Sequence, residues 1–98
     1  GQDRMDEAIK WWERASKGGN VVAQFALGQA YYQGDAVEQD LEKAYTWVMV
    51  SANPKSKSQR RYQKQASAYQ QELTDAQMAS ATKAIDACLS SGYVDCPY

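Results

Sequence analysis

The stretch LGQAYYQGDAVEQDLEKAYTW, residues 27–47, decides the fold of this chain. Up to Gly34 its apolar residues fall at helical intervals, with Leu27 and Tyr31 on one face. Gly34 then ends that pattern, and a short polar loop leads to a second helical pattern that contains Trp47. Two helices joined by a loop of this length pack against each other in antiparallel fashion. The stretch therefore predicts a helical hairpin.

Outward from this stretch, the sequence predicts about five helices, over residues 6–17, 21–33, 41–52, 57–73 and 75–91. The expected helix starts share capping side chains: Asn20, Asp40, Ser56 with Gln59, and Thr74 with Gln77. The expected buried residues of the last two helices are Tyr62, Ala66, Tyr69 and Leu73, then Met78, Ala81, Ala84, Ile85 and Cys88 or Leu89. No long alternating run predicts a strand, so the expected fold class is all-α.

Four positions of the first helix have the same or a similarly small residue in the third, at a constant displacement of 36 positions. The pairs are Ala8 and Ala44, Trp11 and Trp47, Ala15 and Ser51, and Ser16 and Ala52. A fixed period of this size is typical of stacked helix pairs. We therefore predict a right-handed superhelical α-solenoid of antiparallel helix pairs. Tyr31, Trp11 and Trp47 are expected to fill its core.

The spacing of motifs in the same stretch resembles that of a known family. Leu-Gly-x-x-Tyr begins at Leu27, Gly34 follows, and Val-x-x-Asp-x-x-Lys-Ala-x-x-Trp begins at Val37. This order resembles the Sel1-like repeat (SLR), a relative of the tetratricopeptide repeat. The chain departs from it at Ala36, where glycine is usual, and at Ser51, where alanine is usual. The resemblance implies a solenoid scaffold for protein–protein assembly, frequently bacterial and frequently outside the cytoplasm.

The resemblance divides the chain into units of unequal completeness. Residues 21–52 form one complete repeat, and residues 6–19 look like the second half of a truncated one. Residues 55–91 look like a degenerate terminal helix pair, followed by a tail over 92–98. We therefore expect a single helical-repeat domain that is the C-terminal part of a longer bacterial protein.

Composition narrows the classes of function. The chain has 98 residues, 44% of them hydrophobic, and a net charge of −1. That balance gives no general attraction to nucleic acid, and no apolar run approaches the ~20 residues that span a bilayer. Histidine is absent, which removes the commonest general base and metal ligand. No catalytic or metal-binding pattern is present, so we expect a non-catalytic chain without a cofactor or metal.

The two cysteines, Cys88 and Cys96, both lie near the end of the sequence. The Ser-Ser-Gly sequence between them can end a helix and let the tail fold back, which would allow a disulfide. A disulfide would favour a periplasmic or secreted location. The alternative is two reduced thiols, which would leave a cytoplasmic location open.

Two groups of residues are candidates for binding a partner. The first consists of residues beside the expected core aromatics: Trp12, Phe25, Gln29, Tyr32 and Tyr45. For Trp12, an alternative is self-association through the truncated N-terminal face. The second group is basic and lies about 150° around its helix from the apolar stripe: Lys57, Arg60, Arg61 and Lys64. These cations are either a solvated face or a surface for an acidic partner.

These observations favour a scaffold or adaptor that binds another protein in a bacterial envelope complex. The alternative is a module that binds a glycan or peptidoglycan fragment, with exposed aromatic residues as stacking platforms. Both readings give the chain a binding role without chemistry of its own.

Overall fold

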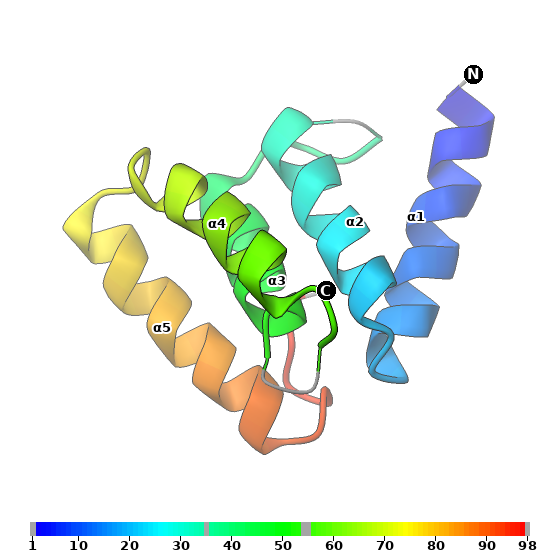
Figure 1. The fold of residues 1–98 in the computed structure, drawn as a ribbon. Helices are drawn as coiled ribbons and strands as arrows, with labels where there is room; N and C mark the ends of the chain where they lie inside the picture. Colours follow the sequence, from blue (N-terminus) through cyan, green and yellow to red (C-terminus); the bar gives the residue numbers. More distant parts are fainter. Residues whose placement is uncertain (1, 35, 54–55, 98) are drawn as a thin grey trace.

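The computed structural model describes residues 2–34, 36–53 and 56–97, and this part of the chain forms five helices without a strand (Figure 1). They are α1 (Gln2–Lys17), α2 (Val21–Gln33), α3 (Leu41–Ser51), α4 (Gln59–Gln70) and α5 (Asp75–Ser90). The all-α prediction is confirmed. The second, third and fifth helices have bounds close to those expected, whereas α1 begins earlier and α4 is shorter at both ends.

Side-chain caps begin three of the helices where the sequence places them. The Asn20 side chain accepts a hydrogen bond from the Ala23 amide at 3.0 Å, and Asp40 begins α3 in the same way. Thr74 and Gln77 form the reciprocal capping box of α5. At the other end of α2, Gly34 adopts a left-handed conformation with φ of 75°.

The capping box expected at Ser56 is wrong. The Ser56 hydroxyl accepts from the Ser58 amide at 3.2 Å, so it closes a tight turn before the helix. The N-cap position of α4 is Ser58, whose side chain makes no capping hydrogen bond. The first turn of α4 is therefore left without a side-chain cap.

The central helix of the fold is α3, and α2 packs closely along it (Figure 1). Gly28 makes this approach possible, because a Cβ there would lie 2.5 Å from Cγ2 of Val48 and 3.0 Å from the carbonyl oxygen of Ala44. The core around this contact includes Leu27 and Trp47, both fully buried, and Tyr31. The expected roles of these three residues are confirmed.

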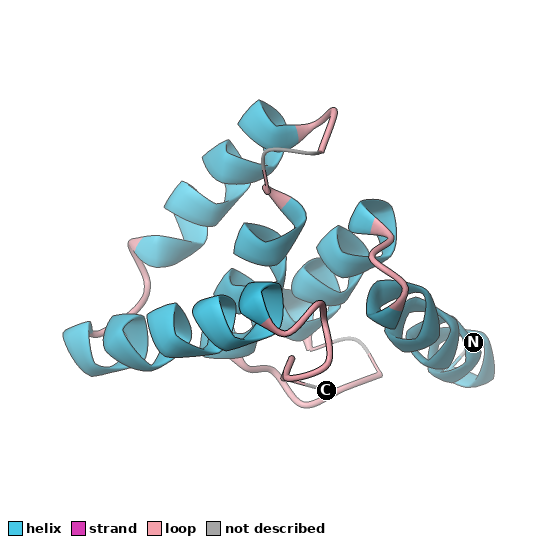
Figure 2. Ribbon diagram, turned by 90° about the horizontal axis from the view of Figure 1, so that it is seen from below, coloured by secondary structure: helices cyan, strands magenta, loops and turns pink. Residues whose placement is uncertain are grey.

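The helices α4 and α5 pack against α3 but scarcely against each other. Viewed from below, they diverge from their connecting turn like the arms of a V (Figure 2). The residue of α4 that lies 37 positions after Gly28 is Gln65. Gln65 is half-buried, so α4 has no glycine at this position like the one that allows the close approach of α2 to α3.

Two positions of α5 have the same burial as their counterparts in α3. Ala44 and Ala81 are fully buried, and so are Ser51 and Cys88, and each pair is separated by 37 residues. The α3 and α5 helices therefore present equivalent small residues to the core.

Trp11 is not a core residue, and this expectation was wrong. Its side chain is 62% exposed, although Trp47, 36 positions later, is completely buried. Trp47 lies in α3, which is covered by α2, α4 and α5, whereas α1 packs chiefly on α2. Among the described residues, no element covers the Trp11 side of α1.

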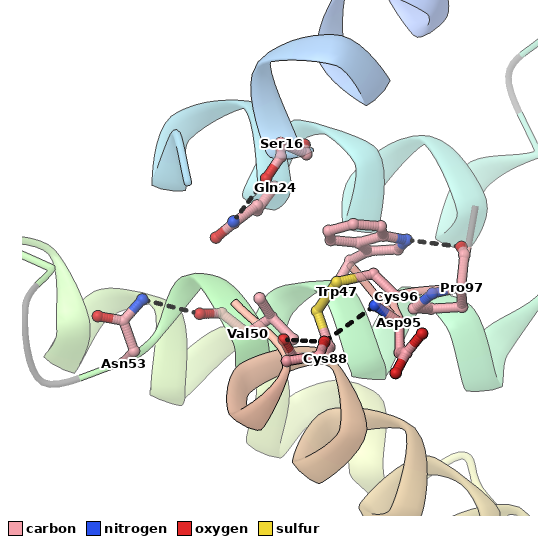
Figure 3. The surroundings of a disulfide bond; sticks show 10 residues. Ser16, Gln24, Trp47, Val50, Asn53, Cys88, Asp95, Cys96 and Pro97 are labelled. Atoms are coloured by element: carbon pink, nitrogen blue, oxygen red, sulfur yellow. Dashed lines mark hydrogen bonds between the residues drawn. A yellow bond between two sulfur atoms is a disulfide. The ribbon is translucent and has the colours of Figure 1, made fainter. Parts of the chain in front are cut away.

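The C-terminal tail folds back from α5 onto α3. A disulfide joins Cys88 to Cys96, with their Cα atoms 4.4 Å apart, so the bonded alternative for these cysteines is the one observed (Figure 3). The indole N–H of Trp47 donates to the carbonyl oxygen of Pro97 at 3.1 Å. The ring of Tyr93 lies against Gly19, where a Cβ would approach it to 3.1 Å. The tail thus connects α5, α3 and the turn between α1 and α2.

Candidate partner-binding surface

Two stacked aromatic pairs join α2 to α4. The rings of Phe25 and Tyr62 have centroids 4.3 Å apart, and those of Tyr32 and Tyr69 have centroids 4.1 Å apart. In each helix the two residues lie seven positions apart, on the same face. Each stacked pair contributes about 0.5–1.5 kcal/mol beyond its buried area. We call these four residues the aromatic ladder; it fixes α4 beside α2.

A hydrogen bond continues the aromatic ladder beyond the end of α4. The hydroxyl of Tyr32 donates to Oε2 of Glu72 at 2.6 Å. This hydrogen bond raises the pKa of Tyr32, and burial raises the pKa of Tyr69. Both shifts favour the protonated hydroxyl, the form that tyrosine already has at neutral pH. Phe25 and Tyr32, which the sequence proposed as partner contacts, already use one ring face within the chain.

The other proposed contacts outside α4 differ in exposure. Gln29 is exposed on α2, and Trp12 is half-buried on α1. Tyr45 is only 6% exposed, so its placement among the exposed aromatics was wrong. It belongs to α3, the helix that its neighbours enclose, and burial raises its pKa. Only Gln29 of these three is readily available to a partner.

The four proposed cations of the second group are all exposed, and with Ser58 they line one shallow open hollow. Arg60, Arg61 and Lys64 share one side of α4, whereas Lys57 lies in the turn before the helix, so the expectation that all four lie on one helix was wrong for Lys57. We call Lys57, Arg60, Arg61 and Lys64 the basic stripe. Within the described residues, no carboxylate lies at ion-pairing distance from any of them.

Charge is strongly segregated along the chain, which the sequence interpretation missed. Residues 43–71 contain six of the eleven lysines and arginines and none of the twelve aspartates and glutamates. The remaining sequence holds the other five cations and all twelve acids. The overall net charge of −1 conceals this arrangement, in which the basic stripe is the part of the positive segment gathered at the start of α4.

The loop between α2 and α3 lines a second hollow beside Tyr31. The ammonium group of Lys43 lies 5.2 Å from the centre of the Tyr31 ring, at a distance typical of a cation–π contact. Burial, and then the charges of Glu13 and Asp40, raise the pKa of Tyr31. These contacts explain the hollow as part of the packing of this loop.

Neither a metal site nor a membrane span is found in the parts of the chain that the structure describes. No group of three or more cysteine, aspartate or glutamate side chains there could hold a metal ion. None of the helices there is both long enough and apolar enough to cross a bilayer.

Comparison with protein families assigns the first half of the chain. The sequence model of the Sel1 repeat matches residues 1–20 and 21–48. Residues 1–48 belong to the Sel1 repeat family. The boundary between the two matches falls where α2 begins, so one match covers α1 and the other covers α2 and most of α3.

A curated relative supports the same assignment over a similar length. It is a protein of Acanthamoeba polyphaga mimivirus named for its Sel1-like repeats, and it is 40% identical over 43 residues. The alignment covers 44% of this chain and 7% of the relative, so the chain spans only a small part of the relative's length. No solved structure matches the chain.

Sel1 repeats are generally modules for protein–protein interaction and generally act as non-catalytic scaffolds. The basic stripe, half of the aromatic ladder and the disulfide lie after residue 48, outside the family matches. The family match therefore does not account for them. The sequence did contain a signal for the aromatic ladder, since each stacked pair is separated by 37 residues.

Proposed function

We propose that this chain is a non-catalytic scaffold that binds another protein in a bacterial envelope complex. The observation that carries this proposal is the way in which α2 and α4 are joined. The aromatic ladder fixes the two helices together, while Gln29 and the basic stripe remain exposed on them. A rigid helical surface with unpaired polar groups is suited to binding a protein partner, because little order has to be gained on association.

The disulfide supports an envelope or secreted location, because such bonds persist mainly in oxidising compartments. We further propose that residues 55–91 are a degenerate third repeat. The shared displacement of 37 residues supports this, since it relates both pairs of the aromatic ladder and the buried small residues of α3 and α5. Lys55 and Tyr98, at the bounds of this unit and of the tail, lie outside the described residues.

Site-specific photo-crosslinking in a bacterial periplasm tests the proposed surface. A photoreactive residue at Gln29 or Arg61 is expected to give one discrete product with the same protein, identified by mass spectrometry. The same residue at Lys83, which is exposed on α5, serves as the control. The identified protein should then bind the purified chain. Equal crosslinking from all three positions, or none from the first two, would contradict the proposed surface.

The location has a separate test. Thiol counting on protein purified without reductant is expected to find no free thiol until a reductant is added. Two free thiols in that protein would remove the argument for an oxidising compartment.

The alternative function is a module for a glycan or peptidoglycan fragment. The exposed indole of Trp11 favours it, because an aromatic face of this kind can stack on a sugar ring. In that case, replacement of Trp11 by alanine would abolish binding of peptidoglycan fragments. If α1 instead takes part in self-association, the same replacement would convert a dimer to a monomer in sedimentation experiments.

A further inference from the structure

We infer that the basic stripe is a docking surface for an acidic, extended segment of a partner protein. This inference rests on the proposed function and names the chemistry of the partner at that surface. It depends on the four cations, on their lack of carboxylate partners within the described residues and on the hollow that they line with Ser58.

The basic stripe opposes the stability of its own helix. Like charges three or four residues apart on a helix repel each other, and Lys64 lies at these spacings from Arg61 and Arg60 within α4. Arg60 and Arg61 also lie in the first turn of α4, where the helix dipole favours anions and disfavours cations. No acidic residue and no side-chain cap compensates there. An anionic ligand would relieve all of these unfavourable interactions together.

The position of the basic stripe is fixed by packing on the other side of α4. Tyr62 and Tyr69 belong to the aromatic ladder, and Ala66 between them is 1% exposed. The charged side of α4 is therefore held in place before any partner arrives. Preorganisation of this kind lowers the cost of binding.

The size of the stripe fits a short peptide segment. Four helical steps from Arg60 to Lys64 correspond to about 6 Å along the axis, and Lys57 extends the stripe into the turn before α4. In an extended chain, side chains on one face recur about every 6.6 Å. Two or three alternating acidic residues would therefore face the whole stripe.

The charge of the rest of the molecule disfavours larger polyanions. Outside residues 43–71, the chain carries more than twice as many acidic as basic side chains. These would be repelled by a duplex or an anionic bilayer, whose charges extend well beyond one helix. A nucleic-acid interface also needs basic groups that follow the phosphate backbone well beyond the length of this stripe.

The test measures binding of a labelled peptide with alternating glutamate and serine to the full chain, by fluorescence anisotropy. The wild-type protein should bind this peptide at low salt and several-fold more weakly at 0.3 M salt. It should not bind a peptide in which glutamine replaces glutamate. Replacing both Arg60 and Arg61 by glutamate should weaken binding about tenfold or more. The control variant, Lys10→Glu with Lys83→Glu, changes the net charge equally at exposed sites on α1 and α5, and should bind nearly as wild type does.

The Arg60→Glu, Arg61→Glu variant should also melt at a higher temperature than wild type, because acids suit the first turn of a helix. A lower melting temperature would overturn the inference, since the arginines would then stabilise the fold. Equal loss of peptide binding in both double variants would overturn it too, as would tighter binding of duplex DNA or anionic vesicles than of the peptide. Salt-sensitive self-association that prevents peptide binding would overturn it as well, because a second copy of this chain would then be the ligand of the basic stripe. If the crosslinks from Gln29 persist when Arg60 and Arg61 are reversed, the proposed function stands and this inference fails.

Discussion

Gly28 determines how closely α2 approaches α3. Replacement by alanine would place a methyl group 2.5 Å from Cγ2 of Val48, so the two helices must move apart. We expect Gly28→Ala to lower the free energy of unfolding by about 1–3 kcal/mol. Urea denaturation followed by circular dichroism measures this change. The matched control is Gly18→Ala, where the nearest atom to a new Cβ is the Ala15 carbonyl oxygen at 3.4 Å. Similar losses in both variants would contradict the proposed role of the close contact.

Ala36 holds a left-handed backbone conformation, with φ of 60°. At this position the chain departs from the Sel1 repeat, in which glycine is usual. Left-handed geometry costs a residue with a Cβ about 1–2 kcal/mol. Replacement by glycine would remove this cost, but the greater freedom of glycine in the unfolded chain would offset part of the gain in stability. Ala36→Gly should therefore raise the free energy of unfolding by about 0.5–1 kcal/mol. The exposed helical residue Ala68 provides the opposite control, since Ala68→Gly should be destabilising. A loss of stability in both variants would argue against strain at Ala36.

At the level of single residues, the sequence predicted core positions well only where their neighbours were also known. Leu27 and Trp47 lie within the helix pair that the motif describes, and both are fully buried. Trp11 matches Trp47 in register but not in surroundings, because a periodic pattern does not reveal whether a neighbouring helix covers it. The expected exposure of Tyr45 was wrong for the opposite reason. Its helix, α3, is enclosed by its neighbours, so a residue beside the main apolar face is buried as well.

The tail is the element whose attachment is easiest to test. The disulfide between Cys88 and Cys96 closes a short loop, and a loop of that length should contribute about 2–3 kcal/mol. A chain with alanine at both positions should be less stable by this amount in urea denaturation, and a reductant should no longer affect it. Reduction of the wild-type protein provides the matched comparison. An unchanged urea midpoint in both experiments would mean that the remaining contacts of the tail suffice.

At the level of helices, local signals were more reliable than long-range ones. Asn20, Asp40 and Thr74 cap their helices because a cap depends on three or four neighbouring residues. Ser56 met the same rule but closes a turn instead, which shifts the start of α4. The divergence of α4 and α5 depends on how each packs on α3, and the spacing of caps and apolar residues carries no information about that.

For the whole molecule, the pattern of titratable groups predicts a broad plateau of stability with pH. Histidine is absent and both cysteines are bonded, so no ordinary side chain titrates between about pH 6 and 9. Burial raises the pKa of Tyr31, Tyr45 and Tyr69 above 10.0. Above pH 10 the unfolded chain therefore loses protons that the folded chain keeps, and stability falls as the pH rises.

Urea midpoints measured from pH 6 to 11 should stay level to about pH 9 and then decline. Tyr45→Phe should make that decline less steep, because it removes one of the buried hydroxyls. An equally steep decline in this variant would show that Tyr45 does not contribute to it.

The candidate surface was predictable from sequence only in part. The four cations of the basic stripe are visible in the sequence as a cluster, and for Arg60, Arg61 and Lys64 exposure follows from the apolar stripe opposite them on α4. Their lack of carboxylate partners among the described residues, and the stacking of Phe25 on Tyr62, depend on contacts between separate helices. Helical periodicity describes one helix at a time, so it cannot supply such contacts.

The position of Trp47 also gives the molecule a built-in optical signal. Its indole lies beside the bond between Cys88 and Cys96, and disulfides quench the excited state of a neighbouring indole by accepting an electron (Figure 3). Trp47 should therefore emit only weakly in the oxidised protein, so that the emission comes from half-buried Trp12 and from exposed Trp11, whose emission is shifted to the red by solvent. Opening the bond should brighten the emission, and Trp47→Phe should abolish that gain. Tryptophan fluorescence could then report whether the bond between Cys88 and Cys96 is formed or reduced.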